Sequence, residues 1–384
     1  MSNRIILNET SYFGRGSRKE IITEIENRHF NKALVISDSA LVEAGVTKLV
    51  TDILDKNNIK YDLFKDIKPN PTVSNVKAGV SFCKESNPDV LIAVGGGSSI
   101  DTTKAIGIIM TNPEHEDVVS LDGVCETENK SLPIIAVPTT AGTAAEVTIN
   151  YVITDEDKTK KMVCVDPHDI PLVAIIDPDL METMPKSLAA ATGMDALTHA
   201  MEGYTTRAAW LIPDMFHINA MSLIFKNLQK AVNEKDKYAI DQVAYGQYIA
   251  GMGFSNVGLG IVHSMAHSLG AYFDTPHGLA NAILLPHVLK FNGKICPELF
   301  ENMGNALGLD MYGVKGDEAV RKVVDAVKNL SISIGIPQTL KEIGIPHDSL
   351  RKLAHQAMYD VCTLGNPRSV SEEDILDIYE EAYE

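Results

Sequence analysis

The first half of the chain alternates short apolar runs with stretches of helical periodicity. Four runs consist mainly of apolar residues: KALVISD (32–38), DVLIAVGGG (89–97), LPIIAVPTT (132–140) and PLVAIID (171–177). Strands of a parallel sheet have this composition, because helices cover the sheet on both faces. Helical patterns such as 41–57 and 72–86 separate the runs. The first half is therefore predicted to be an α/β domain with a wound parallel sheet.

The pattern changes twice further along the chain. INYVITDEDKTKKMVCVD (149–166) consists of two strand-like segments around a charged turn, which predicts a hairpin. After Pro178 and Pro185, long Ala/Leu/Met periodicity begins near Ser187 and no strand-like run follows. We therefore expect two domains, an α/β domain over 1–185 and an all-helical domain over 186–384, as a chain of 384 residues usually exceeds one core.

Composition narrows the possible partners and compartment. The net charge of −17 argues against nucleic acid, because a polyanion would be repelled. Neither a signal peptide nor an apolar run of about 18 residues is present, so we expect no membrane association. The five cysteines are scattered and never form a CxxC pair, which is typical of reduced thiols and favours the cytoplasm.

Candidate metal ligands occur in GMDALTHAME (193–202) and IVHSMAHSLGAYFDTPHG (261–278). Asp195 and His199 stand four apart, so a helix would place them on one face, and His263 and His267 repeat that spacing. His277 lies between Pro276 and Gly278, where a bend can turn a further imidazole inward. One carboxylate and three neutral imidazoles leave a bound divalent metal with net positive charge, as a Lewis acid requires.

Eleven histidines also make chance pairs at this spacing possible, and a single pair is more often structural than a ligand. The apolar surroundings favour a metal site of Asp195, His199, His263 and His277. A catalytic site needs an open position, so His267 is interpreted as a neighbouring proton carrier.

Two loops have the composition of phosphate-binding elements. AVGGGSSIDTTKAIG (93–107) is an apolar strand that runs through three glycines into a helical pattern, although it matches neither GxGxxG nor the Walker loop. PTTAGTAAEVT (138–148) also follows an apolar strand and offers hydroxyl donors and a glycine. A triple glycine or a Ser/Thr loop alone can be an ordinary turn, but both in one wound domain imply a dinucleotide.

Asp38 ends its apolar run at a position where a carboxylate can accept hydrogen bonds from a ribose. A 2′-phosphate would meet a like charge there, so NAD is favoured over NADP. The alternative is that Asp38 only caps the following helix.

Four motifs together resemble the iron-containing, or group III, alcohol dehydrogenases: GGGSSIDTTK (95–104), PTTAGTAAEVT, GMDALTHAMEGY and HSMAH…PHG. The resemblance covers nearly the whole chain. It implies a dehydroquinate synthase-like fold, with a dinucleotide-binding domain followed by a helical metal-binding domain. It further implies that Asp195, His199, His263 and His277 bind Fe(II), although the ligand types would accept Zn(II) as well. The cofactor residues that it implies are Asp38, Asn70, Gly96, Gly97, Ser98, Ser99, Asp101, Thr139, Thr140, Gly142, Thr143, Asn150 and Lys161.

The resemblance implies NAD-dependent hydride transfer to or from a small alcohol or aldehyde whose oxygen the metal binds. Runs such as MVCVDPHDIP (162–171) and GQYIAGMGFSNVGLG (246–260) resemble the lactaldehyde-reducing branch, so lactaldehyde and 1,2-propanediol are the expected pair. Glycerol or 1,3-propanediol dehydrogenation is the alternative. A dehydroquinate synthase-like lyase is disfavoured, because few Lys or Arg residues lie near the metal residues. A third alternative is a metal-free binding protein in which the four ligands are accidental, and metal analysis of the purified protein tests it.

We also expect a homodimer, with RIILNET (4–10) as an edge strand.

Overall fold

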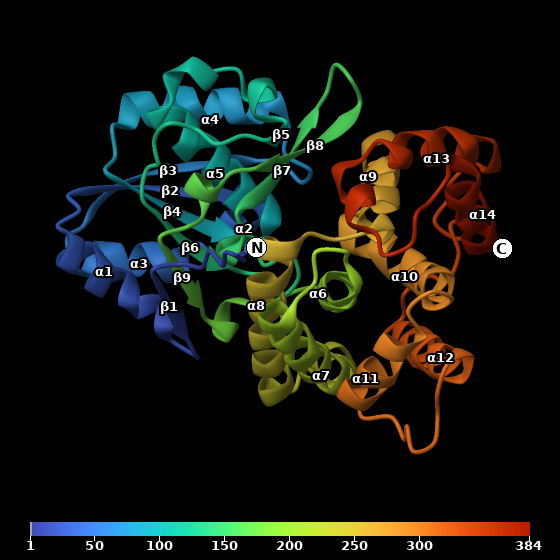
Figure 1. The fold of residues 1–384 in the computed structure, drawn as a ribbon. Helices are drawn as coiled ribbons and strands as arrows, with labels where there is room; N and C mark the ends of the chain where they lie inside the picture. The colour runs from blue at the N-terminus through green and yellow to red at the C-terminus, as the bar shows by residue number, and fades with distance from the viewer. Residues whose placement is uncertain (1) are drawn as a thin grey trace. The chain divides into compact units, whose positions relative to one another are not determined.

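The computed structural model describes residues 2–384, which form two compact units (Figure 1). The first unit contains the residues up to Thr140 together with Ala144–Thr183. The second contains Met184–Glu384 and, in addition, the three residues Ala141–Thr143. The hydroxyl-rich loop predicted from the sequence is therefore divided between the units.

A six-stranded sheet forms the centre of the first unit, and all of its neighbouring strands pair in parallel. The four predicted apolar runs are confirmed as its four inner strands. Along the sheet the strands are β1 (Thr10–Phe13), β9 (Val173–Ile176), β6 (Ile134–Pro138), β4 (Val90–Gly95), β2 (Lys32–Asp38) and β3 (Lys60–Ile67).

Helices cover both faces of this sheet, with α4 (Val73–Ser86) and α5 (Gly97–Thr111) on one and α1 (Glu20–Arg28) and α3 (Lys48–Lys56) on the other (Figure 1). Alternate residues of each strand feed the two cores: Leu34 packs in one and Val35 in the other. This arrangement confirms the predicted α/β class.

The predicted hairpin is also confirmed. The strands β7 (Asn150–Asp155) and β8 (Lys160–Val165) pair antiparallel and, with β5 (Gly123–Val124), form a small second sheet. Buried Lys104 of α5 holds the start of the hairpin against the helix. Its Nζ donates to the carbonyls of Thr148, at 2.6 Å, and Asn150, at 2.8 Å.

Three details of the sequence interpretation are corrected. The strand at the start is Thr10–Phe13, so RIILNET (4–10) is not a strand, and Asn8 instead donates to the carbonyls of Glu146 and Pro171. The β3 strand was not predicted, because it lies at a sheet edge and half of its side chains are polar. The predicted helix over 41–57 is interrupted between α2 (Ser39–Glu43) and α3, where Gly45 takes φ 75°.

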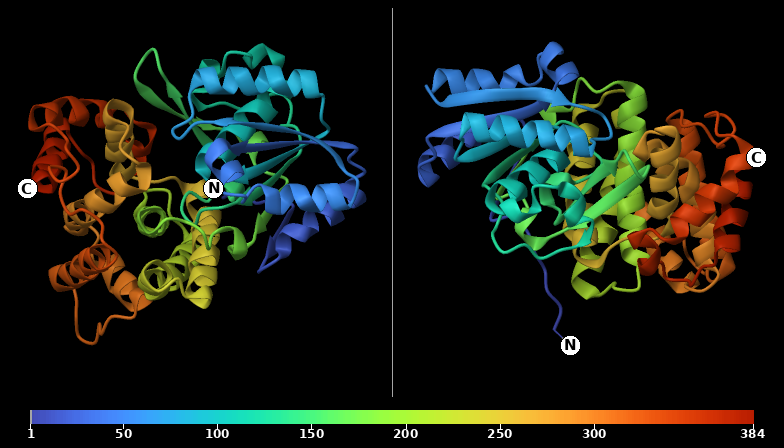
Figure 2. Two further views of the ribbon diagram at one scale, coloured as in Figure 1. Left: turned by 180° about the vertical axis from the view of Figure 1, so that it is seen from behind. Right: turned by 90° about the horizontal axis from the view of Figure 1, so that it is seen from above.

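The second unit is helical throughout, as predicted. Figure 2 shows its helices from two further sides, with α7 and α8 running alongside one another. The helix α6 packs against α7, α8 and α10, and most of its residues are buried. The helices are α6 (Lys186–Thr205), α7 (Leu211–Asn233), α8 (Lys237–Val257), α9 (Ile261–Phe273), α10 (His277–Gly293), α11 (Pro297–Leu307), α12 (Asp317–Ser333), α13 (Leu350–Met358) and α14 (Glu372–Tyr383). Within residues 2–384, no helix combines the length and apolar character needed to cross a bilayer.

Candidate metal centre and cofactor-binding edge

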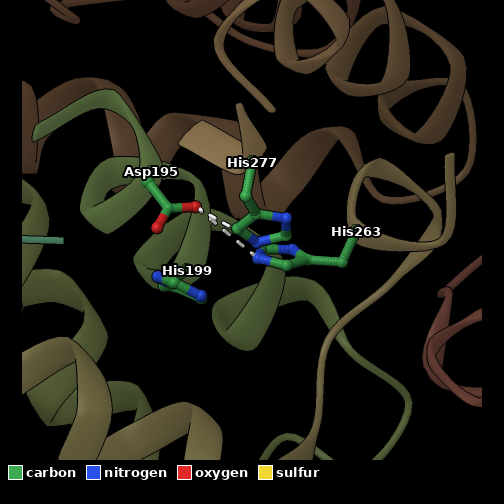
Figure 3. Close-up of side chains that lie close together, drawn as sticks. All are labelled: Asp195, His199, His263 and His277. Carbon is green, nitrogen blue, oxygen red and sulfur yellow. Dashed lines mark ion pairs between the residues drawn. The ribbon is translucent and has the colours of Figure 1, made fainter. Parts of the chain in front are cut away.

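Three helices of the second unit bring the four predicted ligands together. Asp195 and His199 lie one turn apart on α6, His263 lies in the first turn of α9, and His277 is the first residue of α10. One possible ligand atom from each of the four lies within 4.8 Å of the others. Figure 3 shows the carboxylate and the imidazole rings gathered around one point.

The carboxylate of Asp195 anchors this cluster. Its Oδ1 lies 3.6 Å from Nε2 of His277 and 3.9 Å from Nε2 of His263 (Figure 3). Asp195, His199 and His263 are buried, whereas the side chain of His277 is 32% exposed. The one partly exposed ligand gives the cluster a side from which an exogenous molecule can approach.

The electrostatics of the cluster suit a cation. Burial lowers the pKa of His199 and takes that of His263 well below its ordinary value, so both rings are neutral and offer lone pairs. Nδ1 of His199 is buried and has no hydrogen-bond partner within residues 2–384. Three imidazoles with one carboxylate are a donor set that fits Fe(II) or Zn(II).

Asn281 is a neighbour of this cluster that the sequence interpretation missed. It stands one turn after His277 on α10, and its Nδ2 lies 2.6 Å from Oδ1 of Asp195. The same nitrogen lies 3.2 Å from Nε2 of His263 and 3.1 Å from Nε2 of His277. The amide therefore faces the lone pairs of three candidate ligands, and the i,i+4 spacing was a usable signal.

Glu202 is the second residue that was missed. It is seven residues after Asp195 on the same face of α6 and is 3% exposed. Its Oε2 lies 2.6 Å from Nδ1 of His263. Burial raises the pKa of Glu202, and the amides of Val262, Gly260 and His263 oppose this shift. The helical spacing was again a usable signal.

His267, the predicted proton carrier, lies one turn after His263 and does not belong to the four-residue cluster. Its ring stacks on that of His277 with centroids 5.3 Å apart, and its Nδ1 lies 2.9 Å from Oδ2 of Asp360. Asp360 is 93 residues away in the sequence, so no local sequence pattern could predict this pair. Phe254 of α8 stacks on His199 at 4.2 Å and supplies an apolar wall beside the cluster.

In the first unit, the two predicted phosphate loops follow adjacent strands. Gly95 ends β4 and pairs with Pro138 at the end of β6, and the amide of Thr139 donates to the Gly95 carbonyl at 3.0 Å. The following helix α5 begins after Gly96 without a side-chain cap and has no acidic residue in its first turn. Its first amides are therefore suited to an anion.

This edge fits a dinucleotide on two observations. The hydroxyl oxygens of Ser99 and Thr139 are buried and have no hydrogen-bond partner within residues 2–384. A Cβ at Gly96 would lie 3.2 Å from the side chain of Thr140, so the glycine permits a close approach that a larger residue would obstruct. Gly97 and Ser98 are partly exposed in the first turn of α5.

The other predicted cofactor residues have varied surroundings. Oδ1 of Asp38 accepts from the amide of Leu41 at 2.8 Å and so caps α2, which is the alternative weighed from the sequence. Asn70 and Lys161 are brought together, with Nζ to Oδ1 at 2.7 Å. Asp101 accepts from the amide of Val152 at 3.0 Å, and burial raises its pKa to about 6.

The last part of the hydroxyl-rich loop belongs to the second unit. Gly142 lies against α6, since a Cβ there would be 3.0 Å from the carbonyl oxygen of Thr192. Thr143 follows it and is partly exposed. Asn150, whose carbonyl accepts from Lys104, is also partly exposed at the start of β7. Cofactor contacts of these residues stay predictions.

The chain matches known proteins along nearly its whole length. Residues 8–178 match the family model described as iron-containing alcohol dehydrogenase, and 189–383 match the C-terminal model of the Fe-containing alcohol dehydrogenase family. The chain is 51% identical to lactaldehyde reductase of Escherichia coli (strain K12) over 383 residues, which covers 100% of each. It is 38% identical to an NAD-dependent methanol dehydrogenase of Bacillus methanolicus, covering 97% of each. A crystal structure of 1,3-propanediol oxidoreductase aligns with a TM-score of 0.96 at 36% identity, covering 100% of both chains.

Proposed function

The chain belongs to the iron-containing alcohol dehydrogenase family, and we propose that it interconverts lactaldehyde and 1,2-propanediol with NAD(H) and a divalent metal. The observation that carries the proposal is the cluster of Asp195, His199, His263 and His277, whose ligand atoms lie within 4.8 Å of one another. The 51% identity to a lactaldehyde reductase along the full length supports the substrate.

In this proposal, the helical domain (186–384) holds the metal through those four side chains. The family name supports iron, although zinc suits the same donors. The ion, when bound, draws electron density from a carbonyl oxygen or lowers the pKa of an alcohol. The neutral rings of His199 and His263 leave the ion its positive charge, and Phe254 keeps water from one side of His199.

His267 is proposed as the group that carries the proton. Reduction of an aldehyde by hydride requires one proton, and oxidation of the alcohol releases one. Because Nδ1 of His267 is engaged with Asp360, Nε2 is the nitrogen that can take up or deliver this proton. The ring stacks on His277, the partly exposed ligand, which favours this role.

The α/β domain (1–185) is proposed to bind NAD, which supplies or accepts the hydride. The relative named NAD-dependent methanol dehydrogenase supports this cofactor. The amides at the start of α5 and the buried hydroxyls of Ser99 and Thr139 would bind phosphate or ribose oxygens, and Asp38 would disfavour a 2′-phosphate. The remaining proposed contacts are those of Asn70, Gly96, Gly97, Ser98, Asp101, Thr140, Gly142, Thr143, Asn150 and Lys161.

We also propose a cytoplasmic homodimer. The β1 strand is at the edge of the parallel sheet, and edge strands are common sites of pairing with a second chain. The five cysteines are all unpaired thiols, as expected in a reducing compartment.

A second candidate function is 1,3-propanediol oxidation, favoured by the TM-score of 0.96 to a 1,3-propanediol oxidoreductase. The two candidates differ in the distance between the reacting carbon and the second hydroxyl. A pocket that hydrogen-bonds this hydroxyl discriminates strongly against an analogue that lacks it or places it elsewhere.

Anaerobic NADH oxidation with Fe(II)-loaded protein tests the proposal. The panel is lactaldehyde, 3-hydroxypropionaldehyde, dihydroxyacetone, propionaldehyde and butyraldehyde. We expect the highest kcat/KM with lactaldehyde. A preference for 3-hydroxypropionaldehyde would favour the second candidate, and equal values for all five would refute a specific substrate.

A further inference from the structure

We infer that Glu202 is a positioning residue of the metal site, which holds His263 in the tautomer whose Nε2 lone pair is available to a cation. The inference rests on the proposed function, because it concerns how the chain prepares one of the four proposed ligands. Glu202 itself is outside the four-residue cluster.

Both carboxylate oxygens of Glu202 are engaged with the start of α9. Oε2 lies 2.6 Å from Nδ1 of His263, and Oε1 accepts from the amide of Val262 at 2.8 Å. Within residues 2–384, the only ion pair of Glu202 is with His263. A carboxylate that is 3% exposed needs such donors, and here the ring of His263 and backbone amides at the start of α9 supply them.

The opposite side of the same ring supports the same proton position. Nε2 of His263 lies 3.2 Å from the amide nitrogen Nδ2 of Asn281. That nitrogen is only 2.6 Å from Oδ1 of Asp195, an acceptor, which fixes the orientation of the amide. The amide has two hydrogens: one is donated to Asp195, and the other faces Nε2 of His263 and Nε2 of His277. An amide nitrogen only donates, so this position favours a bare Nε2 on His263. The proton is then on Nδ1, where Glu202 accepts it.

This arrangement is the one that a metal-binding histidine needs. A carboxylate on the remote nitrogen selects the tautomer, orients the ring and raises the basicity of the coordinating nitrogen. Glu202, Asp195 and His199 share one face of α6, so the same helix supplies two proposed ligands and the support of a third.

A simpler role for Glu202 would be to cap α9 through the amide of Val262. Glu202→Gln separates the two roles, because glutamine has the same length and its carbonyl can still accept from that amide. Its NH2 group would then face Nδ1 of His263 and can only donate. The ring would lose its acceptor or shift its proton to Nε2, where the proton obstructs coordination.

The test is Zn(II) affinity, measured by competition with a chromophoric chelator on metal-free protein. We expect Glu202→Gln to weaken Zn(II) binding by about 10- to 100-fold relative to wild type. The matched control is Asp360→Asn, which makes the same change opposite Nδ1 of His267, one turn further along α9. Its affinity for the first equivalent of Zn(II) should equal that of wild type, because the second possible cation group, His267, Asp360 and Cys362, is separate from the four-residue cluster.

Equal affinities of Glu202→Gln and wild type would overturn the inference and leave the proposed function standing. Equal losses in both variants would also overturn it, because the effect would then be a general one of buried carboxylates. A wild-type protein that binds no Zn(II) would instead refute the proposed metal site itself.

A measurement on the wild type keeps the inference testable if Glu202→Gln does not fold. Nitrogen NMR of ¹⁵N-histidine-labelled, metal-free protein distinguishes the two tautomers of His263. We expect the proton on Nδ1, and a signal from protonated Nε2 with bare Nδ1 would overturn the inference.

Discussion

Asp360 holds Nδ1 of His267 at 2.9 Å from its Oδ2. Burial would raise the pKa of Asp360, but the ring of His267 and the amide of Cys362 outweigh burial and place that pKa below its ordinary value. The carboxylate is therefore ionised at neutral pH. It stabilises the His267 ring with Nδ1 protonated, so the proposed proton transfer is assigned to Nε2.

Asp360→Asn is expected to lower kcat by about 100-fold, because the ring of His267 loses the carboxylate that orients it. Iron content should stay at the wild-type level, because the four proposed metal ligands are unchanged. Steady-state kinetics and metal analysis on the same preparation check this. Unchanged kcat would remove Asp360 from the account, and loss of iron would place His267 among the ligands.

Asp38→Asn is expected to increase kcat/KM with NADPH by about tenfold, because it removes a negative charge near the proposed site of the 2′-phosphate. Asparagine is as good a helix cap as aspartate, so the bond to the amide of Leu41 and the stability of α2 should survive.

Asp38→Ala is the control for this prediction, since it removes the charge and also costs about 1 kcal/mol of cap stability. Kinetics with both cofactors and thermal melts separate the two effects. If neither variant uses NADPH better than wild type, Asp38 has no part in cofactor choice.

His217 is expected to make the protein sensitive to acid. It is 0% exposed between Gly203 and Gly253, both ring nitrogens have no hydrogen-bond partner within residues 2–384, and burial lowers its pKa to about 3. Between pH 6.5 and 3, His217 binds a proton in the unfolded chain but not in the folded chain. The free energy of unfolding therefore decreases as the pH is lowered, by up to about 1.4 kcal/mol per pH unit.

His217→Leu should remove this component. Urea unfolding of metal-free protein at pH 7 and pH 5 should show a smaller loss of stability in the variant than in wild type. Parallel losses would mean that another group controls the acid response.

The fold could be predicted where burial on both faces makes a strand uniformly apolar. The β2 strand begins at Lys32 and ends at Asp38, as the pattern predicted, whereas β3 at the sheet edge carries polar residues that hid it. The interruption between α2 and α3 depends on one backbone torsion, that of Gly45, which periodicity does not report.

The candidate site follows a similar rule. The spacing of Asp195 and His199 and the two motifs around His263 and His277 predicted the set that the structure brings together. Glu202 and Asn281 also stood at helical spacing from these residues but were not identified. Asp360 could not be found from the sequence, because only the packing of distant segments places it beside His267.

Iron content measured together with NADH-dependent lactaldehyde reduction, after anaerobic Fe(II) loading of wild type and His263→Ala, tests the central claim most directly. We expect stoichiometric iron and turnover in the wild type, and loss of both in the variant, since the remaining three ligands no longer enclose the ion. A folded His263→Ala protein that reduces lactaldehyde at the wild-type rate without bound metal would contradict the account.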